Sequence, residues 1–302
     1  MITKENILEK ELKEVNRRMF NTSMKTVMLF IFLFVEVFIV GSFMIKSRII
    51  ENPMDKDKNY IAVIDLDQEI TTKYIHSIMD KIEVNAKKDN VKEFLIIVNS
   101  PGGSPSASDE LSEYLKYVNK NKKVTIYVES MAASGAYYIA SAIKPLYANK
   151  NAIVGSIGVI MPHYNIGGLA KKLGIEEDYI AAGKFKKPVS LFKEIDSENK
   201  EYLIKNMVKP TYENFIASVA ANRGLSIKKI KEFAEGTIYI ANDPRIKGIL
   251  IDKITNLYLV KQEIKDRYKD IHFKNITEVK NKGLFPLNAK VNFNLNDSTL
   301  LK

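Results

Sequence analysis

The sequence predicts an α/β domain with a mainly parallel sheet and flanking helices, preceded by one transmembrane helix. After residue 60, four short apolar runs rich in β-branched residues alternate with stretches of helical character. Such runs are typical of strands buried on both faces of a parallel sheet and covered by helices. Near the amino terminus, 16 of the 20 residues from 26 to 45 are apolar. About twenty such residues cross the hydrocarbon layer once.

The apolar stretch at 26–45 is predicted to be an uncleaved anchor. It contains one charge, Glu36, and it is longer than the apolar region of a signal peptide. Residues 1–25 then form a cytoplasmic tail, and the polar residues 46–59 form a linker. Four Lys or Arg residues lie on each side of the stretch within fifteen residues, so positive charge does not orient the chain. The tail fits either a helix on the membrane surface or a short solvated helix, because apolar residues recur at helical spacing: Leu8, Leu12, Val15 and Met19.

The folded domain is predicted to begin at residue 60 and to alternate strand and helix. The apolar runs predict strands at 61–66, 94–99, 124–129 and 152–160. Amphipathic patterns predict helices at 72–88, 106–119, 133–143, 197–222, 226–234 and 257–268, and Ser106 is expected to cap the second of these. The main domain then spans residues 60–257, followed by a helix and tail at 258–302.

The amino-acid composition excludes several classes of protein and several kinds of site. Of 302 residues, 46% are hydrophobic and 27% charged, which is ordinary for a globular protein and excludes wholesale disorder. The absence of cysteine removes disulfides, thiolate metal sites and cysteine nucleophiles, and three histidines disfavour a zinc enzyme. A zinc enzyme is therefore not expected. The net charge of +10 suits an anionic membrane surface, whereas nucleic-acid binding lacks interleaved aromatics or a known module.

Two short segments have the composition of a catalytic turn. In 99–103 (NSPGG) a predicted strand ends in a proline and two glycines, whose N–H groups can point at an oxyanion. A tight turn without catalysis is the alternative. In 130–135 (SMAASG) a serine among small residues follows another predicted strand. Ser134 is the candidate nucleophile, because its hydroxyl would lie at a helix amino terminus. Small residues that only permit close helix packing are the alternative.

A serine nucleophile needs a base, and the residues alone leave two kinds open. His163 lies 29 residues beyond Ser134, just after a predicted strand. Three lysines at 184, 186 and 187 follow Gly183. A lysine becomes a base when burial or a nearby cation lowers its pKa, but composition does not decide which of the three would do so.

The ordered motifs resemble the signal peptide peptidase A (protease IV) family of membrane-anchored serine peptidases, serine peptidase family S49. They are NSPGG at 99–103, SMAASG at 130–135, GSIGV at 155–159 and GKFK at 183–186. The family shares its fold with Clp protease and crotonase, and the resemblance covers residues 60–254. Two departures are Ala136, where members often have a second glycine, and the stretch 237–239 (TIY), which replaces a more usual Gly-Arg-Val-like sequence.

The resemblance implies a function and a set of roles. Ser134 would be the nucleophile, Lys186 the general base and Ser156 the hydroxyl that orients the lysine. The oxyanion hole would use the N–H of Gly135 and one from the turn formed by Gly102 and Gly103. The family also implies an anchored homo-oligomer on the extracytoplasmic side of the cytoplasmic membrane, in which the lysine of one protomer serves its neighbour's serine. Its substrates are apolar remnants of signal peptides, and its reaction requires no metal or cofactor.

Three other functions stay open at this point. The same fold could serve as an inactive oligomeric scaffold at the membrane, although the presence of all three site side chains argues against it. A Ser-His peptidase would use His163 as its base. A crotonase-like enzyme acting on acyl thioesters would also need paired backbone N–H groups, but it leaves the anchor and the lysine unexplained.

Overall fold

The computed structural model describes residues 4–46 and 58–277. The chain forms two compact units, Met1–Lys58 and Asn59–Lys302. Most of the predicted linker, residues 47–57, and most of the predicted tail, residues 278–302, lie outside the described residues. Each unit is described by itself.

The first unit is one long helix, α1 (Lys4–Lys46). The range Leu12–Phe43 is long enough to cross a membrane, and an 18-residue window within it has a mean hydropathy of 2.4. Thr22 and Thr26 donate their hydroxyls to the carbonyls of Arg18 and Thr22, so both side chains are satisfied within the helix. The residues before position 26 are helical, as their spacing predicted, and they continue the same helix without a break.

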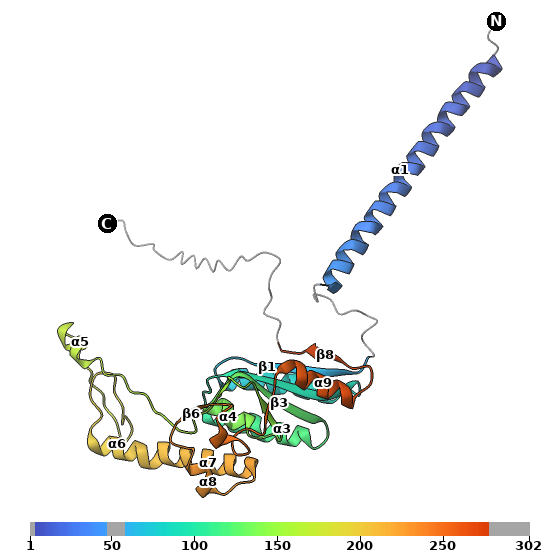
Figure 1. Cartoon of the computed structure of the whole chain (residues 1–302). Helices are drawn as coiled ribbons and strands as arrows, with labels where there is room; N and C mark the ends of the chain where they lie inside the picture. Colours follow the sequence, from blue (N-terminus) through green and yellow to red (C-terminus); the bar gives the residue numbers. More distant parts are fainter. Residues whose placement is uncertain (1–3, 47–57, 278–302) are drawn as a thin grey trace, which may run out of the picture. The chain divides into compact units, whose positions relative to one another are not determined.

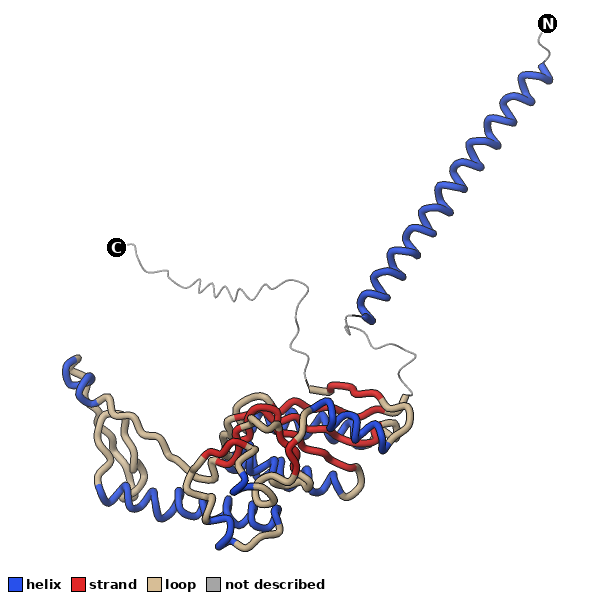
Figure 2. The backbone as a smooth tube through the Cα atoms, viewed as in Figure 1, coloured by secondary structure: helices blue, strands red, loops and turns tan. Residues whose placement is uncertain are grey.

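The second unit is a sheet with helices on both faces (Figure 2), and the predicted fold class is confirmed. The sheet order is β6-β5-β3-β2-β1-β8, with β4 pairing β3 and β7. All pairs are parallel except β5 with β6. The strands are β1 (Tyr60–Leu66), β2 (Val91–Ser100), β3 (Lys123–Ala133), β4 (Leu146–Ala148), β5 (Ile153–Gly155), β6 (Ile238–Ile240), β7 (Lys253–Ile254) and β8 (His272–Asn275).

Two predicted boundaries change near the candidate nucleophile. The strand expected at 152–160 stops at Gly155, because Ser156 has a φ of 51° and leaves the sheet. The helix expected at 133–143 starts only at Gly135, because β3 continues to Ala133, which pairs with Gly155. Both corrections move a serine from inside an element to the junction where a strand ends.

The six predicted helices of this unit are present in the predicted order, but α5 and the short η3 were not predicted, and two predicted helices differ locally. Ser104 caps α3 in place of Ser106, since its Oγ accepts the N–H of Ala107, and Pro105 takes the first helical position that suits proline. The helix predicted at 197–222 contains a wider π turn, because Pro210 offers no N–H to the carbonyl of Asn206. The bounds are α2 (Thr72–Ala86), α3 (Pro105–Asn119), α4 (Gly135–Ala140), α5 (Gly167–Lys172), α6 (Ser197–Leu203), the π segment η2 (Ile204–Val208), α7 (Lys209–Arg223), α8 (Ile227–Lys231), η3 (Pro244–Ile246) and α9 (Leu257–Arg267).

Each face of the sheet has its own core, which explains the continuous apolar runs. Along β1, Ala62 and Ile64 belong to the larger core with α2, α3, α4 and α7, whereas Ile61 and Val63 pack with Val260 of α9 on the other face. Figure 1 shows α9 on one side of the strands and α3 and α4 on the other. The helix α9 and β8, which pairs with β1, thus pack on the same sheet as residues 60–257.

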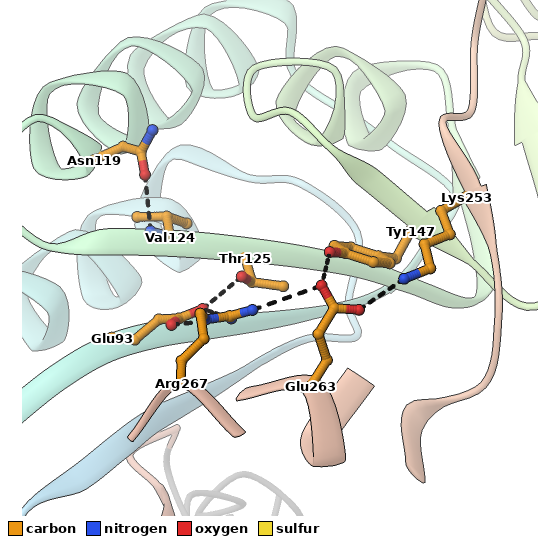
Figure 3. A network of polar contacts seen from close by, with 8 residues as sticks. All are labelled: Glu93, Asn119, Val124, Thr125, Tyr147, Lys253, Glu263 and Arg267. Carbon is orange, nitrogen blue, oxygen red and sulfur yellow. Dashed lines mark hydrogen bonds and ion pairs between the residues drawn. The ribbon is translucent and has the colours of Figure 1, made fainter. Parts of the chain in front are cut away.

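A buried ionic network fastens α9 to the sheet (Figure 3). Glu93 of β2 is fully buried, and its Oε1 lies 2.5 Å from the Thr125 hydroxyl and 2.8 Å from Nη2 of Arg267 on α9. One turn earlier on α9, Glu263 accepts the Tyr147 hydroxyl at 2.6 Å and pairs with Lys253 at 2.8 Å. The buried carboxylate therefore has its charge and its lone pairs satisfied only while α9 is in place.

Replacing Arg267 by methionine is expected to lower the free energy of unfolding by about 3 kcal/mol, because it leaves the Glu93 carboxylate buried without its cation. Urea unfolding of the detergent-solubilised chain measures this. The control is Arg245→Met, which removes an exposed pair with Asp243 and should cost at most about 1 kcal/mol. Adding Glu93→Gln to Arg267→Met should recover part of the loss. Equal effects of the two arginine variants would contradict the prediction.

Candidate active site

The candidate site is built where three neighbouring parallel strands end. Gly102 and Gly103 follow β2, Ser134 follows β3 and Ser156 follows β5, and these strands lie side by side in the order β2, β3, β5. Because parallel strands end at the same edge of a sheet, residues 54 positions apart in the chain meet there. The structure thus brings together five of the six predicted site residues, including Gly135.

Ser134 occupies a strained turn between β3 and α4. Its φ of 51° and ψ of −124° belong to a region that side chains other than glycine rarely adopt, and such strain collects at functional sites. The turn is held by the Ser134 N–H, which donates to Gly155 O at 2.9 Å, and by the Ser134 carbonyl, which accepts from the Tyr138 N–H at 3.0 Å. No residue in the described chain hydrogen-bonds the Ser134 hydroxyl. It is therefore available to a base and a substrate.

Ser156 repeats this geometry on the adjacent strand. Its φ is also 51°, and its N–H donates to Thr237 O at 2.8 Å. Since Ala133 pairs with Gly155, the residues that follow them, Ser134 and Ser156, leave the sheet next to each other. The backbone thus places the residue predicted to orient a base next to the candidate nucleophile.

The glycine turn after β2 contacts the nucleophile turn directly. The Ile70 N–H donates to Gly102 O and the Ser104 N–H donates to Ile70 O, both at 2.8 Å. The Gly103 N–H takes part in neither of these two hydrogen bonds. Gly135 begins α4, so its N–H has no acceptor within the helix. A Cβ on Gly135 would lie 3.3 Å from Gly103 N. Two N–H groups are therefore close together beside Ser134, as an oxyanion hole requires.

Ser134, Gly103 and Gly135 line a cleft of about 680 Å³ between α3, α4, α7 and the segment after β5, whereas Gly102 and Ser156 do not line it. At its base, the buried Tyr138 lies with its hydroxyl 2.6 Å from both Asp109 Oδ1 and Ser218 Oγ. Burial raises the pKa of Tyr138 to about 12, so the phenol keeps its proton at neutral pH. These three residues were not predicted as a group, because they lie on three different helices, α3, α4 and α7, and only the fold brings them together.

The candidate bases lie elsewhere in the chain. Between β5 and α7 the chain forms an arm, residues 157–203, and Figure 1 shows its outer part with α5 projecting away from the sheet and α4. Lys186 is an exposed residue of this arm. His163 is also in the arm, with Nε2 2.8 Å from Ser190 O. Neither lines the cleft around Ser134 in the single chain.

The three lysines of the arm differ in their partners. Lys184 pairs with Glu198, and Lys187 lies 2.5 Å from Glu177, whose pKa its hydrogen bond lowers. The Lys186 ammonium takes part in no hydrogen bond or ion pair with the residues that the structure describes. Because an ion pair stabilises the charged form of an amine, Lys186 is the best candidate of the three for a base.

A parallel α/β sheet with a strained serine and paired glycine amides at its strand ends defines a site for acyl-transfer chemistry. The sequence model of peptidase family S49 matches residues 116–271, just over half of the chain, and includes Ser134, Ser156 and Lys186. The chain belongs to peptidase family S49, as its motifs predicted.

Three relatives illustrate the similarity. A putative protease of Methanocaldococcus jannaschii is 38% identical over 223 residues, which cover 73% of this chain and 70% of that protein. A putative signal peptide peptidase SppA of Enterococcus faecium is 35% identical over 54% of this chain and 47% of its own length. The chloroplastic serine protease SPPA of Arabidopsis thaliana is 27% identical over 71% and 29%. The chain thus aligns with between 29% and 70% of the length of each of these relatives.

Proposed function

We propose that the protein is a membrane-anchored serine endopeptidase with a Ser-Lys dyad. The strained turn at Ser134, next to the N–H groups of Gly103 and Gly135, is the observation that supports it most directly. Ser134 is the nucleophile, Lys186 the general base and Ser156 the hydroxyl that orients the lysine. The oxyanion is bound by the N–H of Gly135 and an N–H from the turn at Gly102 and Gly103.

The reaction follows from these positions. Neutral Lys186 takes the proton of Ser134 as Oγ attacks the peptide carbonyl, and the backbone N–H groups stabilise the oxyanion. The lysine then gives the proton to the leaving amine, and the acyl-enzyme forms. Water, activated by the same amine, hydrolyses the ester. In this scheme the lysine carries out every proton transfer, and the backbone N–H groups stabilise the negative charge on the oxyanion.

The base is proposed to come from a neighbouring copy of the chain. In the single chain the arm extends from the domain, and it exposes more large apolar side chains than a solvated loop requires. Packing of this surface against a second copy would remove the Lys186 amine from water, which favours the neutral form. The apolar side chains include Tyr164, Leu169, Leu173, Ile175, Ile180 and Leu191.

The helix α1 is proposed to anchor the assembly in the cytoplasmic membrane as a single span, with the catalytic domain on the extracytoplasmic side. A domain tethered there would meet the apolar remnants that signal peptidase leaves in the bilayer, and relatives named signal peptide peptidase support this substrate. The scaffold alternative and the Ser-His alternative gain no support, since Ser134 has the geometry of a nucleophile and His163 hydrogen-bonds Ser190 O in the arm.

Mixing two inactive variants tests the shared site. Ser134→Ala and Lys186→Met should each abolish peptide hydrolysis. Coexpression in equal amounts should restore about a quarter of the wild-type activity, because in a random head-to-tail assembly about one contact in four joins an intact Ser134 to an intact Lys186 of the neighbour. Lys184→Met is the matched control and should retain activity, since Lys184 is held by Glu198. Activity of Lys186→Met alone would contradict the dyad. An inactive mixture that still forms oligomers would place both groups in one chain.

A further inference from the structure

One charged side chain lines the cleft around Ser134, and it has no cationic partner among the described residues. Asp109 of α3 uses Oδ1 to accept the Tyr138 hydroxyl, and no described group binds Oδ2. The next carboxylates on the same helix are paired, Glu110 with His76 at 3.1 Å and Glu113 with Lys116. Asp109 is therefore an exposed carboxylate that lines the cleft without a cationic partner among the described residues, although the protein has a net charge of +10.

The rest of the cleft suits a long aliphatic stem. Phe215 packs against Tyr138 with ring centroids 5.1 Å apart and ring planes tilted by 31°. Val159 and Ile160 contribute apolar surface from the segment after Ser156. A lysine or arginine side chain buries its methylene groups on such walls while its charged end reaches a carboxylate. An apolar side chain of the same length would fill the walls but leave Asp109 unpaired.

We propose that this cleft is a subsite for a lysine or arginine side chain of the peptide substrate, and that Asp109 selects it. The proposal rests on the proposed peptidase function, because the same cleft holds Ser134. Signal peptides have a basic region before their apolar stretch. The subsite would therefore direct cleavage to the boundary between these two regions rather than to the middle of the apolar stretch.

Two peptides that differ at one position provide the test. The substrates are quenched fluorescent peptides with an apolar core, made in pairs that have either Arg or Leu at one position. Three such pairs place this position one, two or three residues before the scissile bond. The full-length assembled enzyme should prefer Arg at one of these positions. Asp109→Asn, which keeps the shape and an acceptor for Tyr138, should lower the Arg-to-Leu ratio of kcat/KM by about 10- to 100-fold, the range for a hydrogen bond to a charged group. High salt should lower the ratio in the same direction.

Glu110→Gln is the matched control, because it removes an equal charge one residue away that is already paired with His76. It should leave the ratio unchanged. If Asp109→Asn lowers hydrolysis of both peptides equally, the carboxylate serves a neighbour's lysine instead, and the subsite proposal fails. An unchanged ratio in Asp109→Asn also overturns it. Labelling of Ser134 by a fluorophosphonate is scored separately: its absence, together with no cleavage of either peptide, would mean that the proposed function itself is wrong.

Discussion

Replacing Ser134 by alanine is expected to lower kcat/KM for peptide hydrolysis by about 10⁴-fold or more, because no other group can form the acyl-enzyme. The variant should assemble as the wild type does, since the hydroxyl makes no hydrogen bond with the described residues. Hydrolysis of a fluorescent peptide by the purified oligomer measures the loss. Ser156→Ala is the comparison: it should reduce the rate less, because it removes a group that orients the base and leaves the nucleophile in place.

The strain at position 134 gives the same experiment a second readout. At a φ of 51°, alanine keeps the steric conflict of serine, whereas glycine has none. Ser134→Gly should thus be as inactive as Ser134→Ala but more stable than it by about 1 kcal/mol, even after the larger entropy of the unfolded glycine chain is included. Thermal unfolding of the two variants compares them. Equal stability would mean that the turn stores no strain, and residual hydrolysis by both would mean that Ser134 is not the nucleophile.

The sequence contains enough information for the central sheet because its strands are long and buried on both faces. The runs at β1, β2 and β3 are apolar at successive positions, and the order of strand and helix then fixes a parallel sheet. The short strands β4, β6, β7 and β8 were missed. With two to four residues each, they are too short to show a period in the sequence, and they form because neighbouring strands offer them partners.

The sequence predicts those site residues that directly follow a strand. A glycine pair and two serines that directly follow apolar runs must meet if the runs are adjacent parallel strands. The exact turns were not predictable, because the positive φ of Ser156 that ends β5 depends on its contact with Thr237, more than 80 positions away. The Asp109, Tyr138 and Ser218 cluster depends equally on tertiary packing. The position of Lys186 relative to Ser134 depends on the proposed assembly, which one chain does not contain.

Replacing Gly102 by alanine is expected to reduce kcat by about 10²- to 10³-fold, the loss that follows removal of an oxyanion-hole donor. An added Cβ would lie 2.6 Å from Ala133 O, 2.7 Å from Gly135 N and 2.9 Å from the Ser134 Cβ. Two of these atoms are backbone, and none can rotate away. The φ of 98° at Gly102 is also one that alanine rarely adopts. The glycine turn must therefore move away from the nucleophile turn, and the two N–H groups no longer point at one oxygen.

The control for this effect is Gly41→Ala in α1, where an added Cβ meets nothing within 4 Å. It should leave kcat unchanged and slightly favour the helix. Because Gly102→Ala damages the oxyanion hole and spares the hydroxyl, Ser134 should still react with a fluorophosphonate, although more slowly than in the wild type. This separates it from Ser134→Ala, which cannot react. A Gly102→Ala enzyme with normal kcat would show that the turn after β2 does not contribute to the transition state, and the oxyanion would then need a donor other than the Gly103 N–H.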